Sequence, residues 1–431
     1  MTQDQLMKEL NLDIASFGSK KERRRSTMST SLLYHAFNIK GYRYRSTEYC
    51  GNEIIFRIEQ DSSTLRCPCC ESRDVIRHGA KYRKLRAPGI AFKHIFIAFA
   101  VPRVECRACG VNRQVKIGFA DENKRHIRQF ERCVLGLSSH MTIQGVALHL
   151  GVSWDVVKDI QKRNLEKKFS KPRLKDLESI AIDEIYTGKI GRFITLVLDL
   201  ATGAVVFVGD GKAADALIRF WRRLKSSGAK IKAVAMDMSK AYISAVTQHL
   251  PNSRIVFDHF HVVKLFNDKL TKLRRDLYRE AKELLHKNVL KGTRWLLLKN
   301  PENLVEDKNE RQRLDEALNL NEPLATAYYL KEDLRALWSQ PNTVTAQRYL
   351  SDWISLAEAS GIKILTDFAS TMRKYRQGIL AYFDYPISTG PLEGTNNKIK
   401  TMQRQAYGFR DKRFFTLKIY ALHLTKYALV G

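Results

Sequence analysis

The segment SIAIDEIY at Ser179–Tyr186 begins the part of the chain that decides the fold. It is a short apolar run rich in β-branched residues, which is typical of a buried strand. Two more strand-like segments follow, RFITLVLDLATG at Arg192–Gly203 and AVVFVGDG at Ala204–Gly211. An amphipathic helix, the strand IKAVAMDMS at Ile231–Ser239, a second helix and the strand SRIVFDHFH at Ser253–His261 complete the series.

The order is three strands, helix, strand, helix, strand, which is the order of an RNase H-like domain: an antiparallel meander that continues into parallel units. We therefore expect a multidomain α/β protein with an RNase H-like catalytic core. The next segment, Val262–Tyr382, is almost wholly helical and too long for such a core, so it predicts an all-α insertion.

Two expectations concern the apolar residues of this insertion. One apolar face of its first long helix is expected to comprise Phe266, Leu270, Leu273, Leu277, Ala281 and Leu284. Its tryptophans Trp295, Trp338 and Trp353 are expected in the core, with stacking of one of them on a flipped base as the alternative.

Two carboxylates stand out in the strand series. Asp183 interrupts a buried apolar strand, and Asp237 lies at the C-terminal end of another. A buried carboxylate is costly without a cation or a partner, so a shared metal site accounts for both. For one aspartate alone, an exposed strand end at a turn would be the better interpretation. The competing acids are Glu184, Asp199, Asp210 and Asp258.

A third acid lies in STGPLEGTNNKIKTMQRQAYGFR at Ser388–Arg410. After the Gly-Pro start, Glu393, Asn397 and Lys400 fall at i, i+4 and i+7, on one helix face. An acid, an amide and a cation aligned in this way can hold a metal and contact a phosphate. Arg404, one turn later, is also expected to contact DNA. The alternative is an amphipathic surface helix, although the Gly-Thr-Asn-Asn run is poor for helix stability.

A strand-like region begins upstream at Leu32, and two cysteine clusters lie within it with strand-like sequence between them. Each cluster contains a Cys-x-x-Cys knuckle, and two knuckles offer four thiolates in the arrangement that Zn²⁺ prefers. The expected ligands of a structural zinc ribbon are Cys67, Cys70, Cys106 and Cys109. Cys69 is a spare that could substitute, while Cys50 and Cys133 are expected to be buried small apolar residues. The alternative is two unrelated pairs of reduced thiols.

The segment Met141–Phe169 predicts two helices around a turn at Gly151, which is helix-turn-helix spacing. The second helix would then present Trp154, Lys158 and Lys162 to DNA. A small helical bundle without a DNA role produces the same pattern. The charge of the chain favours DNA binding.

The composition supports a polyanionic partner. The 431 residues carry 74 Lys+Arg against 45 Asp+Glu, a formal net charge of +29. Many phosphate contacts explain such a charge better than a generally basic, solvated surface does. No apolar run approaches the roughly 18 residues needed to cross a bilayer, and the N-terminus lacks a signal-peptide pattern, so we expect a cytoplasmic, nucleoid-associated protein and no membrane partner.

These residues carry a resemblance. The chain resembles DDE transposases of bacterial insertion sequences, closest to the ISL-three (ISL3) family. The matching motifs, in order, are LYHAFNIKGYRY, the CPCC…CRACG ribbon, the helix-turn-helix, IAIDEIY, AVAMDMSKAY, DHFHVVK and GPLEGTNNKIK. The Tyr and Arg that precede the glutamate in some related families are not found here at that spacing, so terminal-phosphate positioning by them is not carried over.

The resemblance implies roles for single residues. It places the catalytic triad on Asp183, Asp237 and Glu393, holding two Mg²⁺ ions, with Mn²⁺ as a substitute. Lys400 matches the Glu/Lys spacing near the third acid. An accessory signature, an acid followed after two residues by a histidine, falls on Asp258 and His261. The implied partners are double-stranded DNA, at transposon ends and target, and a second copy of the chain, at least on DNA.

We accordingly divide the chain into six parts: a basic flexible tail (1–30), a zinc-ribbon domain (31–120), a helix-turn-helix domain (121–175), the first part of the core (176–261), the helical insertion (262–382) and the C-terminal helices of the core (383–431). The expected activity is cleavage of DNA at terminal inverted repeats and joining of the 3′-OH ends to target DNA. Two alternatives remain: a non-catalytic DNA-binding regulator derived from a transposase, and a structure-specific nuclease.

Overall fold

The computed structural model describes residues 32–188, 192–212 and 214–424. The expected basic tail, 1–30, lies outside them. The chain divides into two compact units, one of Met1–Ser138 with Gln144–Ile160 and one of Ser139–Ile143 with Gln161–Gly431. Among the described residues, no helix is both long and apolar enough to span a membrane.

The first unit contains a five-stranded sheet in the order β1-β2-β4-β3, with β5 paired to β4. The β2/β4 pair is parallel, and the other pairs are antiparallel. The strands are β1 (Tyr42–Cys50), β2 (Glu53–Gln60), β3 (Val75–Arg86), β4 (His94–Cys106) and β5 (Asn112–Gln114). The strand-like reading from Leu32 is wrong at its start, because Leu32–Phe37 forms the short helix α2, which buries Leu33 and Phe37.

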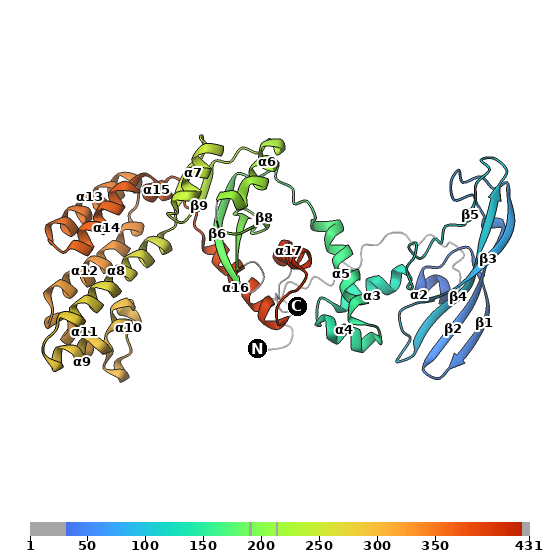
Figure 1. Cartoon of the computed structure of the whole chain (residues 1–431), viewed down its shortest axis with the longest axis horizontal. Coiled ribbons are helices and arrows are strands. Elements are labelled where there is room, and N and C mark those ends of the chain that lie inside the picture. Colours follow the sequence, from blue (N-terminus) through green and yellow to red (C-terminus); the bar gives the residue numbers. More distant parts are fainter. Residues whose placement is uncertain (1–31, 189–191, 213, 425–431) are drawn as a thin grey trace, which may run out of the picture. The chain divides into compact units, whose positions relative to one another are not determined.

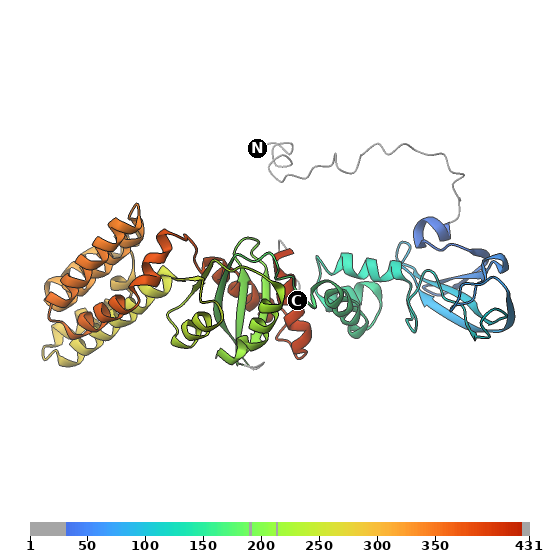
Figure 2. The same cartoon turned by 90° about the horizontal axis from the view of Figure 1, so that it is seen from above.

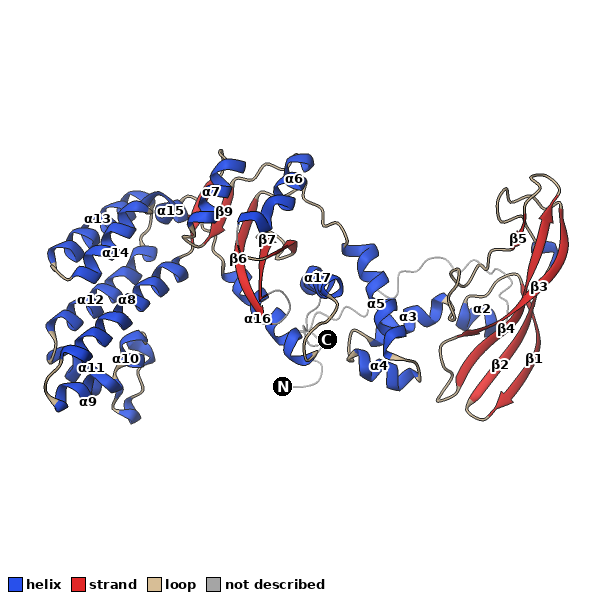
Figure 3. Cartoon of the chain, viewed as in Figure 1, coloured by secondary structure: helices blue, strands red, loops and turns tan. Residues whose placement is uncertain are grey.

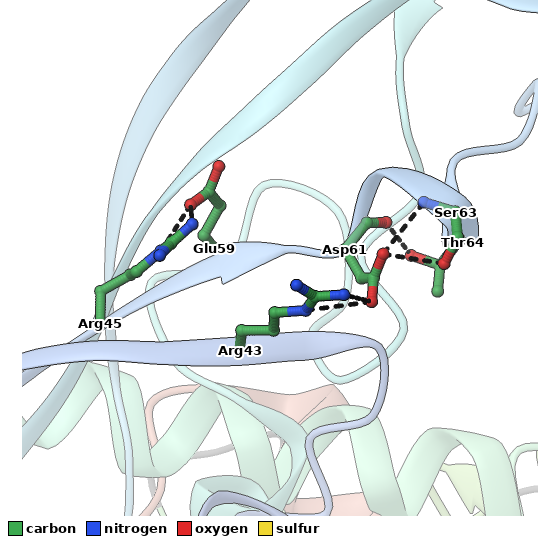
Figure 4. A network of polar contacts seen from close by, with 6 residues as sticks. All are labelled: Arg43, Arg45, Glu59, Asp61, Ser63 and Thr64. Carbon is green, nitrogen blue, oxygen red and sulfur yellow. Dashed lines mark hydrogen bonds and ion pairs between the residues drawn. The ribbon is translucent and has the colours of Figure 1, made fainter.

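A network of polar side chains stabilises the end of β2, from which the chain continues to the first cysteine knuckle (Figure 4). Arg43 of β1 donates from Nη2 to Asp61 Oδ2 at 2.8 Å, and Asp61 Oδ1 accepts from the Ser63 amide at 3.0 Å. Arg45 donates from Nε to Glu59 Oε2 at 2.6 Å across the same strand pair. These contacts pair both arginines with carboxylates and fix the loop that leads to Cys67.

Three helices follow the sheet: α3 (Arg128–Leu137), α4 (Ile143–Leu150) and α5 (Trp154–Phe169). The predicted turn at Gly151 is present, with a φ of +62°. This φ favours glycine, and a Cβ at Gly151 would also lie 2.5 Å from the His94 ring of β4, which would have to move. Arg86 Nη2 also donates to the Leu150 carbonyl oxygen at 2.9 Å. The turn is thereby anchored to the sheet.

The second unit contains a five-stranded sheet in the order β10-β9-β6-β7-β8 (Figures 1 and 3). Strands β6, β7 and β8 form the antiparallel meander that the sequence predicts, and β9 and β10 add to it in parallel. The strands are β6 (Ser179–Gly188), β7 (Arg192–Asp199), β8 (Val205–Asp210), β9 (Ala233–Met236) and β10 (Arg254–Phe257).

Helices cover both faces of this sheet because side chains alternate along each strand. On one face, α6 (Ile218–Ser227) and α7 (Lys240–His249) pack with the Ile180 and Ile182 side chains of β6 in one apolar cluster. Two C-terminal helices, α16 (Gly390–Gln405) and α17 (Lys412–Ala421), contact β6 and β8. Figure 1 shows α16 beside β6.

The helical insertion begins directly after β10 and gathers beside that end of the sheet (Figure 2). Its α-helices are α8 (His259–Glu280), α9 (Leu284–Gly292), α10 (Arg294–Leu298), α11 (Glu310–Asn319), α12 (Glu322–Ala336), α13 (Thr343–Ala359), α14 (Lys363–Lys374) and α15 (Arg376–Leu380). Phe266, Trp353 and Phe368 meet edge to face at the centre of its core. Such aromatic contacts favour one packing arrangement.

Two expectations for the insertion need correction. The first long helix ends at Glu280, so Ala281 and Leu284 do not continue its apolar face: Ala281 is extended, and Leu284 begins α9, which turns back to pack against α8. Trp353 is buried and Trp338 partly buried, but Trp295 is 65% exposed, and the Arg294 guanidinium lies 4.7 Å from its ring. Trp295 is therefore not a core residue.

Candidate active site and zinc centre

Asp183 and Asp237 come from neighbouring parallel strands. Ala181 of β6 pairs with Ala235 of β9, so the same register two residues further brings Asp183 level with Asp237. Asp237 directly follows β9, and its Oδ1 accepts from the Ser239 amide at 3.0 Å. Parallel pairing thus brings together two acids that are 54 positions apart in the sequence.

The electrostatics of Asp183 suit a cation. Burial raises the pKa of Asp183, and the nearby Asp237 carboxylate raises it further. The Glu184 amide, His261 and Asn396 act in the opposite direction on this pKa. Carboxylates are hard oxygen ligands of the kind that Mg²⁺ prefers, and a cation would offset the cost of burying the Asp183 charge. Asp183 and Asp237 thus supply two ligands that fit such an ion. Among the described residues, however, the four knuckle cysteines form the only close group of three or more candidate metal ligands, so Glu393 does not complete such a group with the two aspartates here.

Asn396 is a site residue that sequence reasoning missed. Its Nδ2 donates to Asp183 Oδ2 at 2.8 Å, and only 9% of the residue is exposed. A signal was present: Leu392, Asn396 and Ile399 follow the i, i+4, i+7 spacing of a buried helix face. An amide within an apolar stripe needs a polar partner, and here that partner is Asp183.

Glu393 lies in the first turn of α16, exposed and one turn before Asn396. The start of this helix is fixed across the insertion, because the Thr389 hydroxyl donates to Asp258 Oδ2, 131 positions away in the sequence. The Glu393 amide in turn donates to the Thr389 carbonyl oxygen at 3.0 Å. The Thr389–Asp258 contact joins the point where the chain enters the insertion to the point where it returns.

The two residues of the accessory signature, Asp258 and His261, lie in different surroundings. Asp258 is buried, directly follows β10 and faces Thr389. His261, in the first turn of α8, is half-buried and near enough to Asp183 to lower the pKa of that acid. Asp258 therefore has a structural role in this arrangement, whereas His261 lies near Asp183.

The competing acids have partners of their own. Asp199 accepts from the Ala201 amide at 3.1 Å within the turn after β7, and Asp210 pairs with Lys412 at 2.9 Å. Glu184 interacts with the buried Tyr242 and also lies near Asp183 and Asp237. Burial raises the pKa of Glu184. Glu184 is thus a further carboxylate beside Asp183 and Asp237.

The residues expected to contact DNA lie on two elements. On α16, Asn397, Lys400 and Arg404 are exposed on one face with Glu393. On α5, Trp154 is exposed, and the Lys158 Nζ lies 5.2 Å from the centroid of its ring. Lys162 is half-buried and pairs with Asp411 at 2.9 Å, so it is already neutralised in this structure.

The two cysteine knuckles meet because β3 and β4 are antiparallel. The first knuckle precedes β3, the second begins at the end of β4, and Val75 pairs with Cys106. The Sγ atoms of Cys67 and Cys109 are 3.5 Å apart, as are those of Cys70 and Cys106. All four lie within 4.8 Å of one another. A tetrahedral zinc site with Zn–S bonds of about 2.3 Å requires S–S separations of about 3.8 Å, so the group fits zinc.

The knuckle backbone favours a thiolate. The Cys70 amide is the main reason that the pKa of the Cys67 thiol is lowered to about 6. Cys69 is exposed and outside the group of four. The expectation that Cys50 is buried is wrong: it ends β1, and its side chain is exposed, whereas Cys133 is half-buried in α3.

Comparison with known proteins gives consistent matches. The family model of the ISL3 transposase, described as "Transposase", matches residues 180–419, and a zinc-finger model of the transposases of IS204, IS1001, IS1096 and IS1165 matches residues 63–109. The transposase for insertion sequence element IS1001 of Bordetella parapertussis is 32% identical over 86% of this chain and 92% of its own length. The transposase for IS1557 of Mycobacterium tuberculosis is 29% identical over 84% and 86%.

Proposed function

This chain belongs to the ISL3 family of transposases, and from that premise we propose that it binds the terminal inverted repeats of an insertion sequence, cleaves DNA there and joins the 3′-OH ends to target DNA. The observation that supports this most is the approach of Asp183 to Asp237, with Asn396 of the Glu393-bearing helix bonded to Asp183. A protein that only binds DNA has no need for such a group of acids.

The catalytic unit in this proposal is an RNase H-like core. The meander of β6, β7 and β8, extended by the parallel strands β9 and β10 and covered by helices, supports that assignment. The domain division is proposed as 31–120 for the zinc ribbon, 121–175 for the helix-turn-helix, 176–261 and 383–431 for the core, and 262–382 for the insertion.

The residues that would hold two magnesium ions are Asp183, Asp237 and Glu393, with Asp183 as the shared ligand. Bound there, the ions would activate a water and stabilise the leaving 3′-oxygen. Asn396 holds the Asp183 carboxylate in one orientation, and His261 adds positive charge beside it when protonated.

In the joining step the freed 3′-OH attacks a phosphorus atom of target DNA, and a 3′-oxygen of the target leaves in line. Lys400 contacts a DNA phosphate in this proposal, and Asn397 contacts the backbone or orients Glu393. Both side chains are exposed on the face of α16 that carries Glu393.

Recognition of the element ends is assigned to the N-terminal modules. Cys67, Cys70, Cys106 and Cys109 hold a structural Zn²⁺, since four thiolates leave no open coordination position. The helix α5 presents Trp154 and Lys158 to DNA. A pair of ends must be held together before joining, so the working form is a homodimer on DNA, in the cytoplasm beside the nucleoid.

One experiment tests the proposal against its two rivals. The full-length protein is incubated with Mg²⁺, labelled duplexes that carry the ends of its element and a target plasmid. Cutting with joined products is expected. Cutting without joining would identify a structure-specific nuclease, and binding without cutting would identify a DNA-binding regulator.

A further inference from the structure

Tyr407 is presented to solvent in an unusual way. Tyr407 is 100% exposed, although it lies just after α16, a helix with one buried face. Its φ is +51°, in the left-handed region that glycine adopts without strain. The Tyr407 amide donates to the Arg404 carbonyl oxygen at 3.1 Å and the Gly408 amide to that of Gln403 at 2.9 Å. This is the Schellman ending of a helix, in which glycine is the usual residue at the position of Tyr407.

The residues that follow Tyr407 hold the loop between α16 and α17 in place. Phe409 is buried, with its ring 4.9 Å from that of Phe415 and 6.1 Å from that of Phe414. Asp411 caps α17 by accepting from the Phe414 amide at 2.9 Å. A tyrosine that is strained, exposed and held on a rigid loop contributes little to folding, which points to a role in binding.

The surroundings of Tyr407 favour a nucleic acid. Glu393, Asn397, Lys400 and Arg404 follow spacings of four, three and four residues, so they line one face of α16, and Tyr407 follows two residues after the helix ends. Neither Arg404 nor Arg410 forms an ion pair within 32–188, 192–212 and 214–424, whereas Lys412 and Arg413 pair with Asp210 and Glu166. Within the described residues, two cations without carboxylate partners therefore stand three residues before and three residues after Tyr407 in the sequence.

From these observations we infer that Tyr407 is a stacking platform for an unpaired base of the DNA end whose backbone follows α16. This inference rests on the proposed function. At 1.5 Å per residue, the 14 positions from Glu393 to Tyr407 span about 21 Å, or roughly six nucleotide steps of 3.4 Å. Every base has an aromatic face, so the ring tolerates any sequence at that step.

The test uses the full-length protein without Mg²⁺ and duplexes of its element ends. Single 5-iododeoxyuridines replace successive nucleotides over about ten positions on each side of the expected cleavage site. After irradiation, mass spectrometry locates the crosslinked residue. A crosslink to Tyr407 from one or two adjacent positions, roughly six nucleotides from the cut, is expected.

Substitutions separate binding from folding. Tyr407→Gly removes the ring and relieves the strained φ, so the Tm is expected to stay or rise while end cleavage falls roughly 5- to 150-fold, the range for loss of one stacked base. Tyr407→Phe should keep the crosslink and the cleavage. Tyr329→Ala, which removes an exposed tyrosine of α12, is the matched control.

Three results would overturn the inference: crosslinks that avoid Tyr407, unchanged cleavage in Tyr407→Gly, or a fall in Tm that accounts for the lost activity. Failure of the wild-type protein to cut with Mg²⁺ would instead count against the proposed function. The crosslink needs no metal and still reports on the base contact.

Discussion

The Nδ2 atom of Asn396 donates a hydrogen bond to the Oδ2 atom of Asp183 at 2.8 Å, across 213 positions of sequence. Asn396 lies one turn after Glu393 in α16, and Asp183 lies in β6, next to the strand β9 that Asp237 directly follows. The Asn396 amide thus links β6, which carries Asp183, to α16, which carries Glu393.

Replacing Asn396 by Ala should lower cleavage by about 10- to 100-fold, the range typical for residues that orient a metal ligand. The lost hydrogen bond frees the Asp183 carboxylate to rotate, so more Mg²⁺ should be needed for half-maximal cleavage. Magnesium titrations of the cleavage rate would measure this shift. Lys398→Ala, at an exposed position of the same helix, is the control and should leave the magnesium requirement near that of the wild type. Equal magnesium curves for wild type and Asn396→Ala would remove Asn396 from this role.

Asp183→Asn, Asp237→Asn and Glu393→Gln should each reduce cleavage by on the order of 10³-fold or more, equivalent to about 4 kcal/mol of transition-state stabilisation. Each change removes a charge that binds metal but preserves the volume of the side chain. Gel-shift assays should show end binding largely intact. Near-normal cutting by one variant would exclude that residue from the triad, and Glu184, the further carboxylate beside Asp183 and Asp237, would then be the next to test.

Cys67→Ser or Cys109→Ser should lower the zinc content of the purified protein and weaken end binding. In so small a domain the free energy of metal binding is free energy of folding, about 10–16 kcal/mol in zinc-finger peptides. Metal analysis and gel shifts measure the two effects. Cys69→Ser is a matched control from the same knuckle, because Cys69 lies outside the group of four. A wild-type protein without zinc would refute the assignment.

Charge reversal at Arg275 and Arg279, both exposed on α8, should reduce strand transfer more than binding of a single end. The N-terminal modules specify the site, whereas phosphate contacts near the core position the scissile strand. Arg348→Glu, exposed on α13 of the same insertion, serves as the control. If both activities of the double variant fell equally, or neither did, the insertion would be a brace around the core.

Local patterns in the sequence predicted most elements of the fold. The meander, the two parallel units, the helical insertion and the glycine turn before α5 are all present. The strand expected at Ser253–His261, however, ends at Phe257, and His259–His261 already belong to α8. The errors arose where local pattern and tertiary packing diverge. The apolar spacing from Phe266 to Leu284 runs through a break at Ala281, because α8 and α9 pack into one core from two directions.

The sequence by itself determined which residues could do chemistry here. The chemistry-bearing groups depend only on spacings of a few residues, which chain geometry converts directly into local positions: the two cysteine knuckles, Asp183 within a strand, Asp237 just after one, and the helix face of Glu393. Only the tertiary structure decided which of these groups meet. The pairing of Asn396 with Asp183 and of Thr389 with Asp258 depends on strand register and on where the chain returns from a long insertion. Those contacts are set by packing of the whole unit, and no short stretch of sequence encodes them.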